Sequence, residues 1–302
     1  MMMAAQLCLA SASATDRPVA LRPPSLRFSA PVMVLSSGPK GVGYADQGFS
    51  LDEQHLWAPR EHAGGLPWSS GPSQYVSSDA GATWKPAPVD MPMIGSPFVI
   101  RVNATPGAAW PVRDLGQKMG WQIDDGWQKG QRLSVFRSVG HTTHYGVQNQ
   151  RWRWKQVNET VVFNLTGHTA WSTKQPNGLY PFSLRQCDSV RLPDESMLVT
   201  AQIQWGGGDP ADTKTSPTSL VVFRAVAPFL HWDLRGIVAN ASQYPTGFHG
   251  YGEGANENSI ALLPDNKTLL VVFRDDDQLG AFNTDTCNYT TVRSTDFGTH
   301  WR

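Results

Sequence analysis

The chain has 302 residues, with 25 Lys plus Arg balanced by 25 Asp plus Glu, so it lacks the basic excess that binds nucleic acid or an anionic membrane surface. Its 28 Gly, 22 Pro and 12 Trp, with apolar residues in short runs, indicate an all-β protein. No apolar stretch reaches the roughly 18 residues that a spanning helix needs, so no membrane span is expected.

The first 25 residues are rich in Ala, Ser and Pro, and we expect them to be disordered or removed. Met1–Ala14 ends like a signal cleavage site, but Gln6 interrupts its apolar run and no basic residue precedes it. Six glycosylation sequons favour a secreted or lumenal location; they lie at Asn103, Asn158, Asn164, Asn240, Asn266 and Asn288.

Cys187 and Cys287 are the only pair left for a disulfide if Cys8 lies in a signal segment. They can equally be two unrelated buried thiols, since their spacing decides nothing.

A short polar motif occurs twice. Ser77–Trp84 reads SSDAGATW, and Ser294–Trp301 reads STDFGTHW. Weaker copies end at Trp152 and Trp232, so the four tryptophans are separated by 68, 80 and 69 residues.

A second short motif, Leu-Pro-Asp, repeats at nearly the same spacing from the tryptophans. Leu192-Pro193-Asp194 precedes Trp232 by 38 residues, and Leu263-Pro264-Asp265 precedes Trp301 by 36. Each Leu-Pro-Asp run is flanked by apolar segments and is predicted to be a hairpin turn. The repeating unit is then a four-stranded antiparallel sheet, and radial stacking of such sheets gives a β-propeller.

The polar motif has the composition of a tight turn. The carboxylate of Asp79 or Asp296 can accept backbone N–H bonds, and the hydroxyl of Ser77 or Ser294 can accept another. Gly81 and Gly298 can adopt the positive φ of a chain reversal, and Trp84 and Trp301 then enter the next strand. We interpret both aspartates as turn residues rather than catalytic groups, because their partners are their own backbone.

The pattern Ser-x-Asp-x-Gly-x-Thr-Trp resembles the Asp-box repeat of the sialidase (neuraminidase) superfamily. The resemblance implies a six-bladed propeller whose boxes lie on the face opposite the active site. Residues 26–302 would form an incomplete propeller of about four blades. Other propellers also use Asp boxes, so the motif indicates architecture more than chemistry.

Two further segments resemble catalytic segments of sialidases. Leu26–Pro31 and Gly43–Glu53 are similar to the family's opening region, which implies that Arg27 is the first arginine of the substrate-binding triad and Asp52 the acid/base. Ser29-Ala30 is an insertion, and Gly48 replaces the usual arginine. Asp46 is a nearby rival for Asp52.

The segment from Asn256 to Arg274 resembles the family more closely. Glu257 would activate the nucleophile and Arg274 would be the second triad arginine. Arginine has a planar guanidinium that matches a sugar carboxylate, and sialidases use a Tyr nucleophile. The resemblance therefore implies a retaining exo-α-sialidase with a sialylated glycan as substrate and no cofactor.

Alternatives remain open at this stage. A non-catalytic Asp-box propeller would bind glycans or proteins, and a propeller glycosidase could act on another acidic sugar. In the family the third arginine and the Tyr nucleophile follow the box equivalent to Ser294–Trp301, where only Arg302 remains. We expect the 302-residue chain alone to be inactive and prone to aggregate. His141 and His144 lack further ligands nearby, so no metal site is expected.

Overall fold

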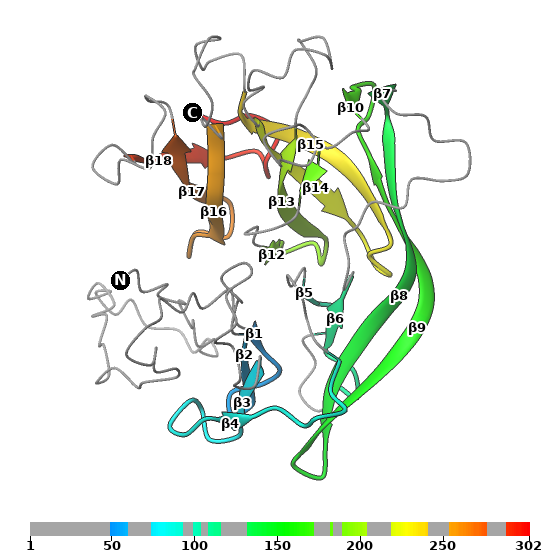
Figure 1. Ribbon diagram of the computed structural model, residues 1–302. Coiled ribbons are helices and arrows are strands. Elements are labelled where there is room, and N and C mark those ends of the chain that lie inside the picture. The colour runs from blue at the N-terminus through cyan, green and yellow to red at the C-terminus, as the bar shows by residue number, and fades with distance from the viewer. Residues whose placement is uncertain are drawn as a thin grey trace, which may run out of the picture. The chain divides into compact units, whose positions relative to one another are not determined.

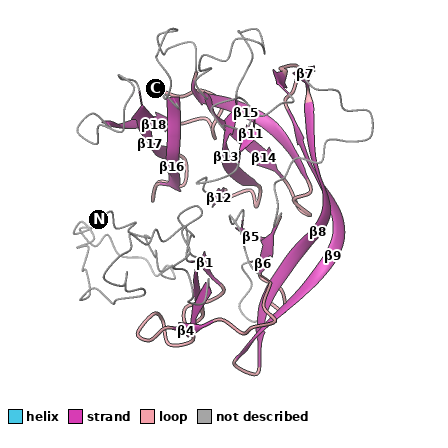
Figure 2. Cartoon of the chain, viewed as in Figure 1, coloured by secondary structure: helices cyan, strands magenta, loops and turns pink. Residues whose placement is uncertain are grey.

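The computed structural model describes residues 49–59, 74–92, 99–103, 108–115, 132–171, 182–183, 189–203, 219–240, 254–276 and 288–302. Contacts divide the chain into Met1–Met33, in which no residue is described, and Val34–Arg302, which holds all described strands. Every regular element in the described ranges is a β-strand (Figure 2), which confirms the all-β prediction. The same ranges contain no helix with the length and apolarity needed to cross a membrane.

The strands form successive antiparallel meanders (Figure 1). The first meander contains β1 (Phe49–Ser50), β2 (Leu56–Pro59), β3 (Gln74–Ser77) and β4 (Lys85–Pro86). The second contains β5 (Val99–Arg101), β6 (Val112–Asp114), β8 (Val135–Gln148) and β9 (Arg151–Asn164). The third contains β12 (Ser189–Arg191), β13 (Met197–Ile203), β14 (Ser219–Ala225) and β15 (His231–Ala239), with β11 (Phe182–Ser183) also on β13.

The last described sheet has three strands, β16 (Gly254–Leu262), β17 (Leu269–Asp276) and β18 (Asn288–Ser294). A separate short pair joins β7 (Arg132–Leu133) to β10 (Ala170–Trp171). The hairpins predicted at the Leu-Pro-Asp runs are confirmed, since β12 pairs with β13 and β16 pairs with β17 on either side of these turns. A meander of four antiparallel strands is the blade of a β-propeller.

One feature differs from the expected separate four-stranded sheets. The outer strands of the second and third meanders pair in parallel, with His231–Asp233 of β15 against Val162–Asn164 of β9. The two meanders therefore form one nine-stranded sheet. This junction joins residues about 70 positions apart in the sequence, and no local pattern specifies it.

Three apolar clusters connect neighbouring meanders. The first and second meanders share a cluster that includes Trp57, Tyr145 and Trp152. The second and third share a larger one built around Phe163, Phe223 and Trp232. The third meander packs on β16–β18 through a third cluster. This sheet-on-sheet packing is how propeller blades bury their faces.

The third meander is buried on both faces. Val199 of β13 belongs to the cluster shared with the second meander, whereas the adjacent Leu198 belongs to the cluster shared with β16–β18. Successive residues of a strand point to opposite faces, so every residue of Met197–Ile203 is buried. Its sequence is consequently a nearly continuous apolar run instead of an alternating one.

Candidate functional site

The first turn motif closes a corner between β3 and β4. The Ser77 hydroxyl donates to Asp79 at 2.7 Å and accepts the Gly81 amide at 2.9 Å. The Asp79 carboxylate accepts the Thr83 amide at 2.9 Å and its hydroxyl at 2.5 Å. Gly81 has φ +85°, and the Trp84 indole donates to the Gly81 carbonyl at 3.0 Å.

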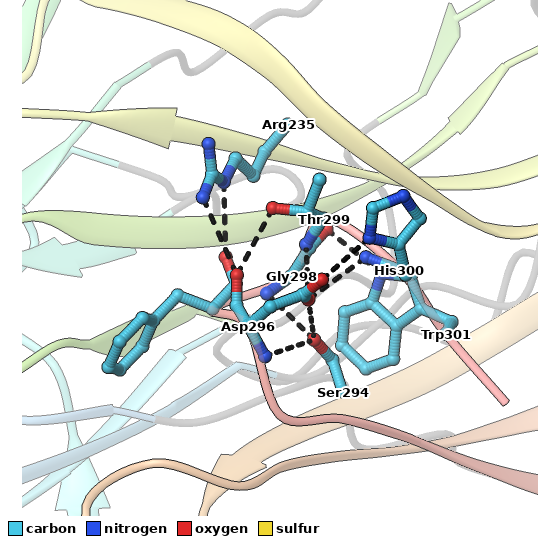
Figure 3. Close-up of polar contacts among 8 residues, drawn as sticks. Arg235, Ser294, Asp296, Gly298, Thr299, His300 and Trp301 are labelled. Atoms are coloured by element: carbon cyan, nitrogen blue, oxygen red, sulfur yellow. Dashed lines mark hydrogen bonds and ion pairs between the residues drawn. The ribbon is translucent and has the colours of Figure 1, made fainter.

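The second motif forms the same corner after β18 (Figure 3). The Ser294 hydroxyl donates to Asp296 at 2.8 Å, and the Asp296 carboxylate accepts the His300 amide at 3.0 Å. Gly298 has φ +86°, and the Trp301 indole donates to its carbonyl at 3.1 Å. In both corners the aspartate contacts its own turn, as a turn residue does.

The two degenerate copies keep parts of this geometry. The Trp232 indole donates to the Phe229 carbonyl at 3.0 Å, and Phe229 has φ +63°. Trp152 is the second residue of β9, after a two-residue turn in which Asn149 and Gln150 both have positive φ. Each of these tryptophans therefore lies at the start of the fourth strand of its meander.

The corner after β18 rests on the third meander. Arg235 of β15 donates to the Phe297 carbonyl at 3.3 Å and to the Asp296 carbonyl at 3.4 Å (Figure 3). A Cβ atom on Gly236 would lie 2.1 Å from the Gly298 carbonyl oxygen. Glycine is required there because the backbone of the corner occupies the space of a side chain.

Hydrogen bonds within the corners hold both aspartates in the carboxylate form. The Thr83 hydroxyl and amide and the Ser77 hydroxyl lower the pKa of Asp79 from 3.8 to about 2. Partial burial raises the pKa of Asp296, but the amide and imidazole of His300 and the Ser294 hydroxyl outweigh that effect, so its pKa lies well below its usual range.

The lowered pKa values predict acid sensitivity of the corners. A carboxyl whose pKa is depressed by folding stabilises the folded state above its unfolded pKa and loses that contribution as the pH falls through its folded value. We expect the thermal unfolding midpoint to fall as the pH drops from 3.8 to about 2, the range set by Asp79. The double variant Asp79→Asn, Asp296→Asn should show a smaller decrease over this range by circular dichroism. An unchanged decrease would contradict the assignment.

The end of β16–β18 far from the corner carries the candidate catalytic residues. Leu269 of β17 pairs with Ser294, the first residue of the corner motif. Five residues further along β17, Arg274 pairs with Asn256 on β16 and with Tyr289 on β18. At about 3.4 Å per residue, this row lies about 17 Å from the corner end.

Glu257 is the extra residue of a β-bulge in this row. Asn256 pairs with Arg274 and Asn258 pairs with Phe273, which leaves Glu257 without a register partner. Bulges redirect side chains and are common next to active sites. The fold thus brings Glu257 and Arg274, 17 residues apart in sequence, to neighbouring strands at one end of the sheet. The half-buried Arg274 also forms an interaction within the protein.

Asp52 lies in the turn between β1 and β2. Its carboxylate accepts the Gln54 amide at 2.8 Å, the His55 amide at 2.7 Å and the His55 Nδ1 at 2.9 Å. Partial burial raises the pKa of Asp52, but these hydrogen bonds outweigh it and leave the pKa below its usual value. A general acid has to hold a proton near the working pH, so this environment disfavours proton donation. The acid role of Asp52 remains a prediction.

Several predicted residues lie outside the described ranges. These are Arg27, its neighbouring motif residues, Asp46 and the two cysteines Cys187 and Cys287. A position of Arg27 beside Arg274 thus stays a prediction. Among the described residues, no group of three His, Cys, Asp or Glu side chains could hold a metal ion.

A polar cluster that the sequence did not predict lies within the second meander. Glu159 of β9 lies 3.5 Å from His144 Nε2 and 3.8 Å from Arg113 Nε, and it accepts the Thr142 hydroxyl. Burial raises the pKa of Glu159, but Thr142, Arg113 and His144 together bring it below its usual value. The only sequence signal was His141-Thr-Thr-His144, because the partners come from three strands.

Arg113 extends this cluster to the third meander. Its Nη1 donates to the Pro228 carbonyl at 2.6 Å, in the corner that precedes Trp232. Arg113 and Arg235 therefore play similar parts, since each donates to the backbone of a corner that belongs to another meander. This arrangement links the second meander to the third.

Comparisons with known proteins give structural similarity only. No protein-family model and no curated protein matches the chain. The GH93 α-L-arabinofuranosidase of Fusarium graminearum with arabinobiose is similar, with a TM-score of 0.41 and 15% identity, over 83% of this chain and 61% of that enzyme. A mutant α-L-arabinofuranosidase of the same fungus, in complex with an iminosugar inhibitor, is also similar. Its TM-score is 0.40 and its identity 16%, over 84% of this chain and 62% of that enzyme. The chain thus spans less than two thirds of these enzymes.

Proposed function

We propose that the protein is a β-propeller glycoside hydrolase that acts on glycans ending in an acidic sugar. Its specific activity in this proposal is that of an exo-α-sialidase, and its propeller has six blades. The proposal rests on one observation. Arg274 lies directly opposite Asn256, beside the bulged Glu257, at the end of the sheet far from the corner turn. This arrangement agrees with an active site on the face opposite the Asp boxes.

The chemistry of the two residues suits that reaction. A sugar carboxylate stays ionised at neutral pH, and arginine binds it through two parallel N–H···O bonds. A glutamate next to the reacting centre can accept the proton of a neutral Tyr nucleophile, the type that sialidases use. Arg274 would then orient the sugar, and Glu257 would activate the nucleophile.

A second function is favoured by the environment of Asp52. Because hydrogen bonds lower the pKa of this carboxyl, it is a poor proton donor, and a propeller without an acid would bind glycans without cleaving them. Turnover separates the two functions: the hydrolase releases sialic acid from a bound sialoside, whereas the binding protein does not.

The variant Arg274→Gln tests the proposed substrate class. Losing a hydrogen-bonded ion pair costs about 1.5–3 kcal/mol, so we expect 3′-sialyllactose to bind about 10- to 100-fold more weakly in calorimetric titrations. Arg293→Gln is the matched control, because Arg293 is exposed and lies at the corner end of the same sheet. It should bind like the wild type.

Neutral ligands complete this test. Lactose and arabinobiose lack the carboxylate, so they should bind weakly and be unaffected by Arg274→Gln. If arabinobiose binds and 3′-sialyllactose does not, the substrate is a neutral sugar and the acidic-sugar proposal is wrong.

A further inference from the structure

The outer strand of the second meander has an open edge. β9 pairs with β8 along Arg151–Asn164, whereas its other edge pairs with β15 only at Val162–Asn164. Among the strands that the structure describes, none pairs with this edge at residues 151–161. Figure 1 shows β8 and β9 as one long curved hairpin. Since the fourth strand of a propeller blade lies at the outer rim, further blades leave this edge uncovered.

The two halves of the open edge differ in charge. The first half carries three exposed basic side chains, those of Arg151, Arg153 and Lys155. In residues 156–161 the one charged residue is Glu159, whose carboxylate accepts the Thr142 hydroxyl within the sheet. Charged side chains on an edge oppose pairing with another chain, whereas an uncharged edge of β-forming residues favours it. The second half therefore lacks the protection that the first half has.

A glycosylation sequon lies in this second half. In Asn158-Glu159-Thr160, the first and third residues lie on the same face of β9 because side chains alternate along a strand. Both Asn158 and Thr160 are exposed. An N-linked glycan is bulky and solubilising, so a glycan on Asn158 would keep another strand from approaching the edge. The sequon thus lies where charged side chains do not protect the edge.

A second sequon on the same strand has a different environment. The Asn164 Nδ2 donates to the Asp233 carboxylate at 2.9 Å, and its Oδ1 accepts the Thr166 amide at 3.0 Å. Asn164 and Asp233 are also register partners in the parallel junction of β9 with β15. A glycan on the Asn164 Nδ2 would compete with the bond to Asp233. The folded protein therefore accommodates a glycan at Asn158 better than at Asn164.

We propose that the protein is secreted, that Asn158 carries an N-linked glycan, and that this glycan covers the open edge of β9. In the modification, the Asn158 Nδ2 attacks the anomeric carbon C1 of a lipid-linked oligosaccharide diphosphate. The C1–N bond forms as the C1–O bond to the diphosphate breaks, the amide loses one proton, and the lipid diphosphate leaves. This inference goes beyond the proposed function, because it applies equally to a hydrolase and to a glycan-binding protein.

Mapping the glycans tests the site. The chain is expressed in mammalian cells with its own N-terminal segment and treated with peptide N-glycosidase in heavy-oxygen water, which converts each glycosylated Asn to labelled Asp. Peptide mass spectrometry should find the label at Asn158 and none at Asn164. An unlabelled Asn158, or equal labelling at Asn164, would overturn the proposal.

Variants of the sequon test the role of the glycan at the edge. Asn158→Gln and Thr160→Ala each destroy the sequon, so each should lose one glycan and aggregate more than the wild type in light scattering at equal concentration. Asn158→Lys also loses the glycan but adds a charge to the edge, so it should aggregate less than Asn158→Gln. Asn164→Gln is the matched control and should keep the wild-type number of glycans.

The results separate the site from its role. If Asn158 is labelled but Asn158→Gln aggregates no more than the wild type, the glycan does not protect the edge and that part of the proposal is wrong. If Asn158→Lys aggregates as much as Asn158→Gln, pairing along the edge is not the cause of the aggregation. Loss of a glycan in Asn164→Gln would contradict the choice between the two sequons.

Discussion

Replacing Glu257 by glutamine is expected to reduce hydrolysis of a fluorogenic sialoside by about 10²- to 10⁴-fold, the range for loss of a general base. Glutamine keeps the size and hydrogen-bonding shape of glutamate but cannot take up a proton near neutral pH. Binding of 3′-sialyllactose should stay close to that of the wild type. The rate and the binding are both measured side by side with the wild-type protein.

Ser259→Ala provides the control for Glu257. Ser259 lies two residues further along β16, is exposed and pairs with Val272 beyond the bulge. It should keep wild-type turnover. If Glu257→Gln also keeps wild-type turnover while sialosides bind, the glutamate is not the base. A protein that binds sialosides without turnover in any form would be the non-catalytic propeller.

Gly236→Ala is expected to cause a large loss of stability. The added methyl group would lie 2.1 Å from the Gly298 carbonyl oxygen and 2.7 Å from that of Thr299. Both atoms belong to the backbone, so the corner after β18 has to move off β15. We expect the free energy of unfolding to fall by about 3 kcal/mol, at the upper end of the usual range for overpacking, as measured by urea denaturation.

Gly167→Ala separates this steric effect from backbone strain. Gly167 has φ +86°, and no atom lies within 4 Å of its added Cβ. The substitution should cost about 1–2 kcal/mol from the left-handed conformation alone. The φ of Gly236 lies outside the left-handed region, so the loss of stability on its substitution reports the contact between the sheet and the corner. Equal or smaller destabilisation by Gly236→Ala would contradict that contact.

Local features were predictable from the sequence. The turn contacts of Ser77, Asp79 and Gly81 join groups no more than four residues apart, and residue type alone specifies such short-range geometry. The hairpins at Leu192–Asp194 and Leu263–Asp265 were predictable for the same reason. Because each such turn joins consecutive strands, residues close together in the sequence determine the strand order within each meander.

The environment of Asp52 was not predictable. Resemblance implied an acid, but the lowered pKa comes from the amides of Gln54 and His55 and from the His55 ring. The result depends on how this turn folds, and a sequence match transfers a residue type without its hydrogen bonds. The Glu257 bulge could not be predicted from the sequence either, because the register of β16 on β17 depends on which residues face the core.

The sequence by itself determined the all-β class, the repeating corners and the hairpins, because each depends on residues close together in the chain. Only the tertiary structure decided the parallel junction of β9 with β15, the Arg113–Glu159–His144 cluster and the backbone contact that requires Gly236. These join groups separated by tens of residues, and their energies come from burial and from carbonyls that exist only once neighbouring sheets have packed. The same packing set Arg274 and the bulged Glu257 on neighbouring strands at one end of their sheet, a juxtaposition that depends on strand register.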